Sequence, residues 1–448
     1  MDNIRKKYLH WEWRTIIVLS IGYALFYFVR KNLSVAIPAM EQELGISKVQ
    51  LGVFLTVNSI IYGFSRFING MLVDRYSKKK IMALGLLLTC AVNLIICFSP
   101  KLDGMFNLLD AEGRATMGLV YLIGSLWVLN GYLQGMGVPP CVSLLAHWIK
   151  PTELSTKQSI WNVSHTFGAG LVVALCGYLL QHFGYSAWYL CFLVPALIAL
   201  LGVPLLWFGL KDDPSEVGLP PVEKMGDETA MQKDAEPDPV AKLSKAQYKK
   251  MINKMVYANP YIWIIAISNF CIYIIRLTIL DWGASFLTEI KGMEIAKAGG
   301  TLGMLLAGWL SDKLFQSKAH RTCFFCIVFA TLSFFLFWKT ESITLSFIFL
   351  IFSSFFIYGP QALFGTCASQ QATKYATGTG NGIVGIFGYA SSVVTGVMFG
   401  ARAEAGGWDS VFPIAIAFGV AGAIAIALMW KAPADGYEKL NKVLKEIE

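Results

Sequence analysis

Two arginines lie in stretches that are otherwise apolar enough to cross a membrane. Arg30, followed by Lys31, interrupts the run TIIVLSIGYALFYFVRKNLSVAIPAM, and Arg276 interrupts CIYIIRLTIL. An arginine near the centre of a bilayer costs at least about 3 kcal/mol. Its planar guanidinium presents a fork of N–H donors that matches the oxygens of a phosphate or carboxylate. These residues therefore predict either an anion-binding site or buried ion pairs.

The apolar stretches offer few carboxylates for such pairs. Asp281 lies near the outer end of the seventh apolar block, and the blocks contain almost no other acidic residue. A phosphate monoester carries about −1.5 to −2 charges near pH 7, which matches two arginines. We therefore expect Arg30 and Arg276 to bind a substrate phosphate. The structural alternative is pairing with neighbours inside the helix bundle.

His165, in the run SIWNVSHTFGAG, is a third candidate. An imidazole changes charge near pH 7 and can therefore follow the protonation of phosphate. The alternative is a neutral histidine that is hydrogen-bonded to a backbone carbonyl. We expect His165 to assist phosphate binding.

Other cations and aromatic residues could line the substrate pathway. Lys31 points about 100° away from Arg30 on a helix and cannot share its face. Arg66, in YGFSRFING, lies deep in the second apolar block. Aromatic side chains with polar tips can bond a hydroxylated substrate, or simply pack between helices. The candidates of this kind are Tyr23, Tyr27, Trp161, Tyr273 and Tyr358.

The composition indicates which elements carry these residues. Of the 448 residues 55% are hydrophobic and 15% charged, whereas soluble proteins carry about 25% charged residues. The apolar residues form blocks of about 20, the length of a helix that crosses ~30 Å of hydrocarbon. Hydropathy predicts helices at Thr15–Pro38, Leu51–Val73, Ile81–Ser99, Met117–Pro139, Lys157–Gln181, Trp188–Leu210, Tyr261–Gly283, Ile295–Leu310, Thr322–Trp338, Ile343–Thr366, Gly378–Gly400 and Val411–Trp430.

A polar stretch divides these blocks into two sets of six. Residues 211–259 are rich in Pro, Asp, Glu and Lys and lack apolar periodicity, which is typical of a linker. We expect an all-α membrane protein with 12 transmembrane helices in two pseudo-symmetric halves. The N-terminal half is residues 1–210, the cytoplasmic linker residues 211–259 and the C-terminal half residues 260–448.

The distribution of charge predicts the orientation. Most of the 37 Lys and Arg residues lie at the termini, in the central linker and in the loops on that same side. The positive-inside rule makes this side cytoplasmic. The net charge of +8 therefore reflects the excess of Lys and Arg on the cytoplasmic side, and no nucleic-acid partner is needed to explain it.

A short motif recurs after the second and eighth blocks. GMLVDRYSKKK contains Asp74 and Arg75, and GWLSDKLF contains Asp312. Both resemble the loop signature of the major facilitator superfamily. This resemblance implies two homologous halves with the substrate site between them, and charge networks at Asp74, Arg75 and Asp312 that act as a conformational switch. The interval from Arg276 to Asp312 is eight residues shorter than that from Arg30 to Asp74, so we expect helix 8 to be short.

Longer motifs resemble one family within this superfamily, the organophosphate:phosphate antiporters. They are GYALFYFVRKN, YGFSRFINGMLVDR, LQGMGVPPC, WNVSH, RLTILDWG and FIYGPQALFG. The resemblance implies that Arg30, Arg276 and His165 bind phosphate. It also implies rocker-switch exchange of glycerol-3-phosphate or hexose-6-phosphate for inorganic phosphate. The family includes a sugar-phosphate sensor, so a membrane sensor with the same pocket remains the alternative.

The remaining expectations concern the setting of the protein. No set of nucleophile and base, metal cluster or phosphate-cradling Gly loop indicates an enzyme. We expect no cofactor and no metal. The expected partners are a phosphate ester, inorganic phosphate and the lipid bilayer. We expect a monomer in the bacterial cytoplasmic (inner) membrane, with both termini in the cytoplasm.

Overall fold

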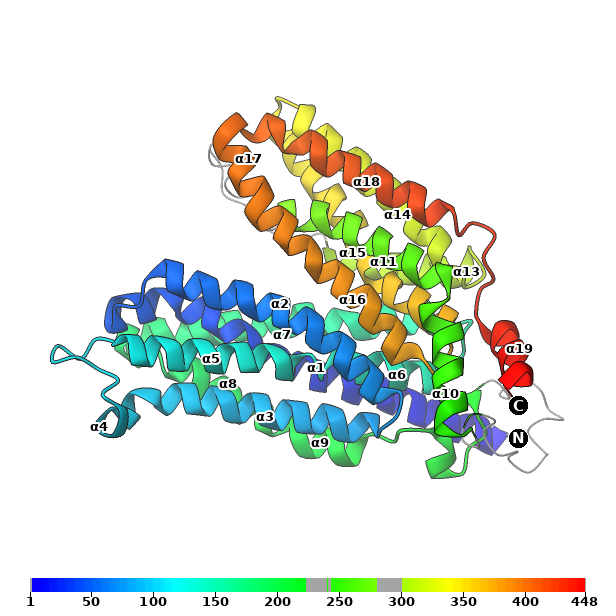
Figure 1. Ribbon diagram of the computed structural model, residues 1–448, viewed down its shortest axis with the longest axis horizontal. Helices are drawn as coiled ribbons and strands as arrows, with labels where there is room; N and C mark the ends of the chain where they lie inside the picture. The colour runs from blue at the N-terminus through cyan, green and yellow to red at the C-terminus, as the bar shows by residue number, and fades with distance from the viewer. Residues whose placement is uncertain (1, 223–239, 241–242, 280–299, 448) are drawn as a thin grey trace. The chain divides into compact units, whose positions relative to one another are not determined.

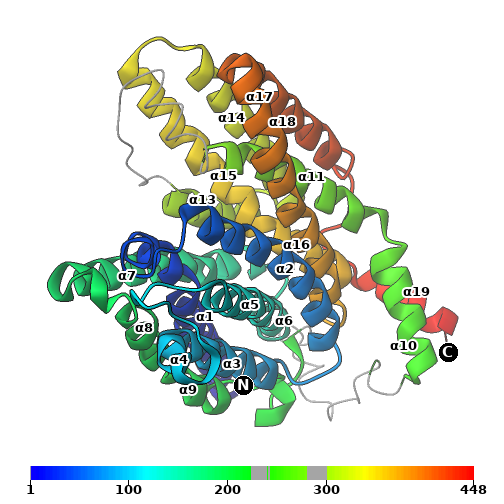
Figure 2. The ribbon, with the colours of Figure 1, turned by 60° about the vertical axis from the view of Figure 1, so that its left-hand side comes forward.

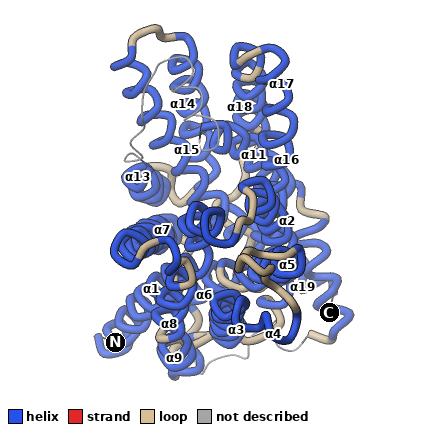
Figure 3. Tube along the Cα trace, turned by 90° about the vertical axis from the view of Figure 1, so that its left-hand side faces the viewer, coloured by secondary structure: helices blue, strands red, loops and turns tan. Residues whose placement is uncertain are grey.

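The computed structural model describes residues 2–222, 240, 243–279 and 300–447 (Figure 1). These residues are almost entirely helical, and the tube in Figure 3 has no strand among them. An isolated bridge between Leu109 and Ala115 closes one loop. The chain divides into two compact units. The first is Met1–Leu144 with Ser164–Leu219, and the second is Leu145–Val163 with Pro220–Glu448.

The first unit is built from long apolar helices and short connections. Its helices are α1 (Asp2–Leu44), α2 (Lys48–Val73), α3 (Lys78–Phe98), α4 (Asp103–Phe106), α5 (Met117–Gln134), α8 (Leu190–Leu200) and α9 (Gly202–Gly209). The start of α2 is set by a capping box, in which Gln50 N donates to Ser47 Oγ at 3.3 Å and Ser47 N donates to Gln50 Oε1 at 2.9 Å. Two further helices, α6 (Val138–Trp148) and α7 (Leu154–Phe183), continue from one unit into the other.

Within the first unit, α1 packs against α3, α5, α8 and α9, and α2 packs against α5. Figure 2 shows α3, α8 and α9 side by side. Small residues permit the close approaches. A Cβ atom on Gly131 of α5 would lie 2.8 Å from the carbonyl oxygen of Asn58 on α2, so only glycine fits there.

The second unit contains the C-terminal helices. They are α10 (Lys245–Ile252), α11 (Pro260–Leu277), α13 (Gly300–Lys313), α14 (Ala319–Lys339), α15 (Ile343–Ala372), α16 (Thr377–Val393), α17 (Phe399–Gly406), α18 (Phe412–Ala427) and α19 (Tyr437–Ile447). α11 starts at a proline after an asparagine cap, Asn259, as helices often do. It packs against α15, α16 and α18, and α15 also contacts α13 and α14.

Eight helices in the described part of the chain are long and apolar enough to cross a membrane. They are Ile4–Leu44, Gln50–Val73, Lys78–Leu102, Leu154–Phe183, Tyr185–Gly209, Pro260–Leu277, Ala319–Lys339 and Thr344–Ala372. Large apolar side chains face outward from the bundles, with Leu201 73%, Phe208 74% and Leu428 71% exposed. Lipid is the medium in which such surfaces are stable. The chain is therefore a multi-pass membrane protein.

Several helix bounds differ from those that hydropathy predicts. α1 extends beyond Thr15–Pro38 at both ends, since a helix is not limited to its apolar part. The fourth block ends at Gln134, and the chain turns at residues 135–137 before α6 carries Pro139 and Pro140 in its first turn. The eleventh block changes to a π-helical turn at Val394–Met398. Residues 280–299, which hold the end of block seven and the start of block eight, lie outside the described residues.

Candidate functional site

Arg30 lies on α1 against two tyrosine rings of the first unit. Its guanidinium carbon is 3.9 Å from the centre of the Tyr62 ring on α2 and 5.3 Å from that of Tyr27, one turn earlier on α1. Tyr62 is 1% exposed and Arg30 is half-buried. A guanidinium over aromatic faces is held by cation–π attraction, and its planar N–H fork is suited to bind an anion.

His165 belongs to the same aromatic group. Its ring on α7 lies 5.6 Å from the Tyr27 ring, and the Tyr27 ring lies 5.4 Å from the Tyr23 ring. His165 is 9% exposed, and Thr166 Oγ1 is 3.4 Å from its Nε2. The structure therefore brings His165, Tyr27 and Arg30 together in one unit. Trp161 lies one turn before His165 on α7 and is buried.

Two other cations of the first unit have different surroundings. The guanidinium carbon of Arg66 is 6.0 Å from the Tyr62 ring, so Arg30 and Arg66 share this ring. Both arginines are half-buried, whereas Lys31 is exposed. The contrast between Arg30 and Lys31 agrees with the 100° step between neighbouring residues of a helix.

Arg276 has a comparable environment in the second unit. It lies in the last turn of α11, with its guanidinium carbon 5.0 Å from the Tyr273 ring and 5.8 Å from the Tyr358 ring of α15. The Tyr273 ring lies 6.1 Å from that of Tyr389 on α16. Each unit thus holds one arginine beside tyrosine rings from two helices.

Few acidic residues lie on the helices around these arginines, and those of α1 are at least eleven residues from Arg30. Near Arg30, no Asp or Glu lies on α2, α3, α5 or α7. Near Arg276, none lies on α11, α15 or α16. Asp281, the nearest acidic residue in sequence to Arg276, lies outside the described residues. Cationic groups in apolar surroundings with few acidic residues create a positive potential that favours anions. The arrangement can therefore bind a phosphate group.

The predicted switch residue Asp312 caps the start of α7 within the second unit. Thr156 N donates to Asp312 Oδ2 at 2.6 Å, and Ser311 Oγ donates to Ser155 Oγ at 3.0 Å. A Cβ atom on Gly308, one turn before Asp312, would lie 2.7 Å from the carbonyl oxygen of Ser155. In this copy of the motif, Gly308 permits the close approach of α13 to α7. Asp312 accepts the hydrogen bond of a backbone N–H at the start of α7 that has no partner within the helix.

An ion pair lies next to this cap. Glu153 Oε2 accepts a hydrogen bond from Lys157 Nζ, four residues later. This hydrogen bond, with the nearby positive charges of Lys150 and Lys313, lowers the pKa of the Glu153 carboxyl below its usual value. Glu153 is therefore charged at neutral pH, where a negative group favours the N-terminus of α7.

The first copy of the motif has another arrangement. Asp74 is half-buried at the end of α2, where its backbone N donates to Gly70 O at 3.3 Å, and Arg75 is exposed. Lys79 N donates to Asp212 Oδ1 at 2.8 Å, and Lys79 Nζ lies 3.1 Å from Glu216 Oε2. Lys79, in the basic run after Asp74, therefore binds the polar segment after α9 through Asp212 and Glu216.

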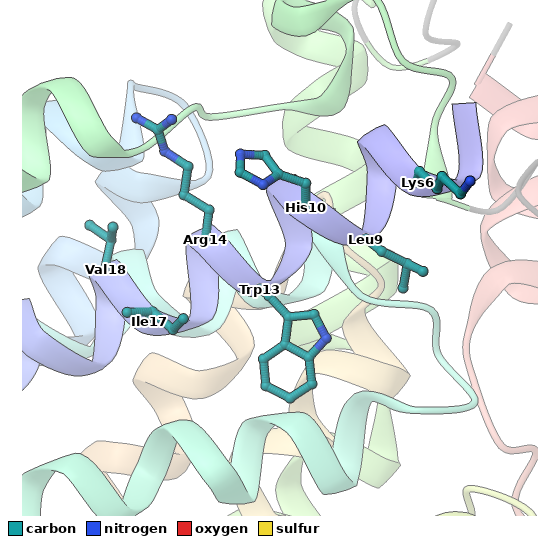
Figure 4. A pocket seen from close by; sticks show the side chains of 7 residues that line it. All are labelled: Lys6, Leu9, His10, Trp13, Arg14, Ile17 and Val18. Carbon is teal, nitrogen blue, oxygen red and sulfur yellow. The ribbon is translucent and has the colours of Figure 1, made fainter. Parts of the chain in front are cut away.

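A surface hollow of about 570 Å³ lies on α1, away from the arginines described above. It is lined by Lys6, Leu9, His10, Trp13, Arg14, Ile17 and Val18 (Figure 4). Val18 is twelve residues before Arg30, or about 18 Å along the helix axis. Arg14 already donates to Gly209 O at 3.1 Å, and its guanidinium lies 4.6 Å from the Trp11 ring. This hollow is not the anion site.

Sequence reasoning missed Tyr62 and Tyr389. Tyr62 lies four residues before Arg66 on α2, so both are on one helix face, and this spacing is a usable signal. No signal in the sequence links Tyr389 to Arg276, because they come from different helices. Within the ranges that the structure describes, no three His, Cys, Asp or Glu side chains form a metal cluster.

The chain is similar to known proteins over most of its length. The family model described as Major Facilitator Superfamily matches residues 19–396. A probable hexose phosphate transport protein of Chlamydia trachomatis is 30% identical over 98% of this chain and 95% of its own length. The glycerol-3-phosphate transporter of Bacillus subtilis is 32% identical over 93% of this chain and 92% of its own.

Two further similarities bear on function and fold. The membrane sensor protein UhpC of Salmonella typhimurium is 30% identical over 97% of this chain and 96% of its own length. Among solved structures, the fucose:proton symporter FucP of E. coli aligns with a TM-score of 0.67 and 12% identity, over 92% of this chain and 98% of that one. At this identity, the second similarity concerns the fold alone.

Proposed function

The chain belongs to the major facilitator superfamily, and from this premise we propose that it exchanges an organic phosphate for inorganic phosphate across a bacterial cytoplasmic membrane. The observation that carries the proposal is the paired environment of Arg30 and Arg276. Each lies beside tyrosine rings from two helices; α2, α11 and α15 contain no Asp or Glu, and the acidic residues of α1 lie at least eleven residues from Arg30. Relatives named as hexose phosphate and glycerol-3-phosphate transporters support a phosphate ester as substrate.

In this mechanism the phosphate group bonds to both guanidinium groups, one from each unit. Each planar guanidinium donates two N–H bonds to phosphate oxygens in bidentate geometry. About two negative charges then offset two positive ones. His165, next to Tyr27, contributes a proton or a neutral donor according to pH. The tyrosine hydroxyls and Trp161 are suited to hydrogen-bond the sugar or glycerol part of the substrate.

Obligatory exchange follows from the electrostatic repulsion between the two arginines when no phosphate is bound. Without an anion, two guanidinium groups repel one another and oppose the state in which the site is closed. A bound phosphate removes this repulsion, so the loaded carrier switches between inward- and outward-open states. We take residues 1–210 and 260–448 as the two moving halves, residues 211–259 as the linker, and Asp74, Arg75 and Asp312 as the switch. The carrier acts as a monomer with both termini in the cytoplasm.

Counterflow in proteoliposomes tests this function. Vesicles of purified protein are loaded with labelled phosphate and receive unlabelled phosphate, glycerol-3-phosphate or glucose-6-phosphate outside. We expect efflux of label that requires an external phosphate compound, with one ester more effective than the other. Vesicles with the Arg276→Gln variant are the control. Label retained in every arm would refute the exchange of phosphate.

A membrane sensor is the second candidate, supported by the similarity to UhpC over nearly the whole chain. A sensor with this pocket would bind the phosphate ester without exchanging it. Binding of glucose-6-phosphate by calorimetry, together with absence of counterflow, would identify this function. Failure of both binding and counterflow would exclude both candidates.

A further inference from the structure

α1 departs from helical geometry at Val29, the residue before Arg30. Val29 has φ −99° and ψ 17°, and its side chain is fully buried. Helices kink at proline, at Gly/Ser pairs, at π-bulges, or where a side chain enters the hydrogen-bond ladder. The stretch Leu25–Leu33 contains no proline, glycine or serine. Side chains from neighbouring helices are therefore the cause to look for.

Three buried amides donate to the backbone of α1 at this point. Asn130 Nδ2 and Asn93 Nδ2 lie 3.0 and 3.2 Å from the carbonyl oxygen of Val29. Gln134 Nε2 lies 3.1 Å from the carbonyl oxygen of Phe26 and 3.4 Å from that of Val29. Asn130 and Gln134 are one turn apart on α5, so they share a face, and Asn93 comes from α3. We call these three residues the amide clamp.

The clamp is itself oriented by α1. Asn32 Nδ2 donates to Asn93 Oδ1 at 2.8 Å and to the carbonyl oxygen of Cys191 at 3.0 Å. Asn32, Asn93 and Asn130 are 0% exposed and Gln134 is 2% exposed. Buried polar groups in a membrane protein need partners within the protein, and the amides of Asn93, Asn130 and Gln134 share the carbonyl oxygen of Val29 as one of theirs.

A fixed carbonyl at Val29 has a direct consequence for Arg30. The carbonyl of Val29 and the N–H of Arg30 belong to one planar peptide group. An amide that holds the oxygen therefore holds the plane from which the Arg30 backbone continues. The direction of this plane sets whether the guanidinium reaches the Tyr62 ring, 3.9 Å away.

We propose that Asn93, Asn130 and Gln134 are positioning residues, which hold the kink of α1 and thereby aim Arg30 at the substrate phosphate. This inference rests on the proposed function, because it assigns these amides a part in phosphate binding. They do not touch the phosphate. Their action is on the backbone before Arg30, and its measure is the affinity for phosphate rather than the rate of switching.

If the amide clamp only stabilised the fold, its variants would lose stability without a specific loss of phosphate affinity. Loss of any buried amide bond lowers stability, so stability alone cannot identify a positioning residue. The matched control is Asn58 of α2, which is buried and donates to the carbonyl oxygen of Trp127 on α5 at 2.7 Å. Asn58→Leu removes one amide-to-carbonyl bond to the same helix without touching α1.

The experiment compares the wild type with Asn130→Leu, Gln134→Leu and Asn58→Leu in proteoliposomes. For each protein, the half-saturating concentration of inorganic phosphate and the maximal exchange rate are measured. Thermal stability in detergent and hydrogen exchange of the backbone at residues 26–33 are measured in parallel, without ligand. Asn130→Ser keeps a hydroxyl donor and replaces Asn130→Leu if that variant does not fold.

We expect all variants to lose stability. Only the clamp variants should raise half-saturating phosphate, by about ten- to a hundredfold, as misplaced binding groups do. Their hydrogen exchange at residues 26–33 should be faster, and their maximal rate should change little. The inference is overturned if the clamp variants and Asn58→Leu bind phosphate equally well. Absence of phosphate binding by the wild type would instead overturn the proposed function, and the inference with it.

Discussion

The guanidinium carbon of Arg30 lies 3.9 Å from the centre of the Tyr62 ring, so a cation of α1 rests on an aromatic face of α2. Arg66, one turn after Tyr62, lies 6.0 Å from the same ring. Both positive charges therefore lie within cation–π range of one ring, and Arg30 is the nearer of the two.

The first prediction concerns the two arginines. Arg30→Lys and Arg276→Lys should each abolish phosphate exchange, because a lysine keeps the charge but lacks the bidentate fork. We expect a loss of at least about a hundredfold in exchange rate at low phosphate, the usual cost of removing a partner from a buried charge pair. The measurement is counterflow of labelled phosphate. Exchange at the wild-type rate by either variant would refute the assignment of that arginine.

The second prediction concerns Tyr62. Tyr62→Phe keeps the aromatic face under Arg30 and should leave phosphate affinity nearly unchanged. Tyr62→Leu removes the face and should weaken affinity by about 3- to 30-fold, which corresponds to a partly buried cation–π contact. Half-saturation of exchange measures both. Equal affinities of the Phe and Leu variants would show that the ring only fills space.

The third prediction concerns Asp312. Asp312→Ala removes the acceptor of Thr156 N and should cost about 1.5–3 kcal/mol, as expected for a hydrogen bond to a charged group. Asp312→Asn keeps an oxygen acceptor and should cost less. Unfolding of the purified protein by sodium dodecyl sulfate gives both values.

A control separates stability from switching. Asp103 Oδ1 accepts a bond from Leu109 N at 2.6 Å in a loop of the first unit, so Asp103→Ala should lower stability without slowing exchange. If Asp312 belongs to the switch, Asp312→Ala should also change the exchange rate. An unchanged rate would leave Asp312 as a helix cap only.

The fourth prediction concerns His165 and pH. Its ring lies 5.6 Å from that of Tyr27, beside Arg30, so its protonation changes the charge near the substrate. The phosphate titrates in the same range, near pH 6 for a monoester. The ratio of wild-type to His165→Asn exchange rates isolates the histidine, because the titration of the substrate is common to both. We expect this ratio to vary between about pH 5 and 8. A constant ratio would show that His165 does not titrate during exchange.

Much of the fold could be predicted from local properties of the sequence. Runs of about 20 apolar residues are sufficient to predict a membrane helix, and the all-helical architecture is confirmed. The starts of α2 and α11 also follow from local capping residues, Ser47 and Asn259. Helix ends within apolar blocks could not be predicted, since the turn after Gln134 leaves hydropathy unchanged.

The site could be predicted in part. Arg30, Arg276 and His165 were identifiable because an ionisable group in an apolar stretch is conspicuous. Tyr62 and the amide clamp were not, because tyrosine and asparagine are ordinary in such helices. Their importance depends on which helix each one faces.

By itself, the sequence determined that the chain is a helical membrane protein, and it predicted that two arginines in apolar stretches bind an anion. Both conclusions need only the composition of single helices. Only the tertiary structure decided that Arg30 rests on Tyr62, that Asp312 caps α7, and that Asn93, Asn130 and Gln134 meet at the carbonyl of Val29. These contacts join residues far apart in sequence, and they depend on how the helices pack against one another.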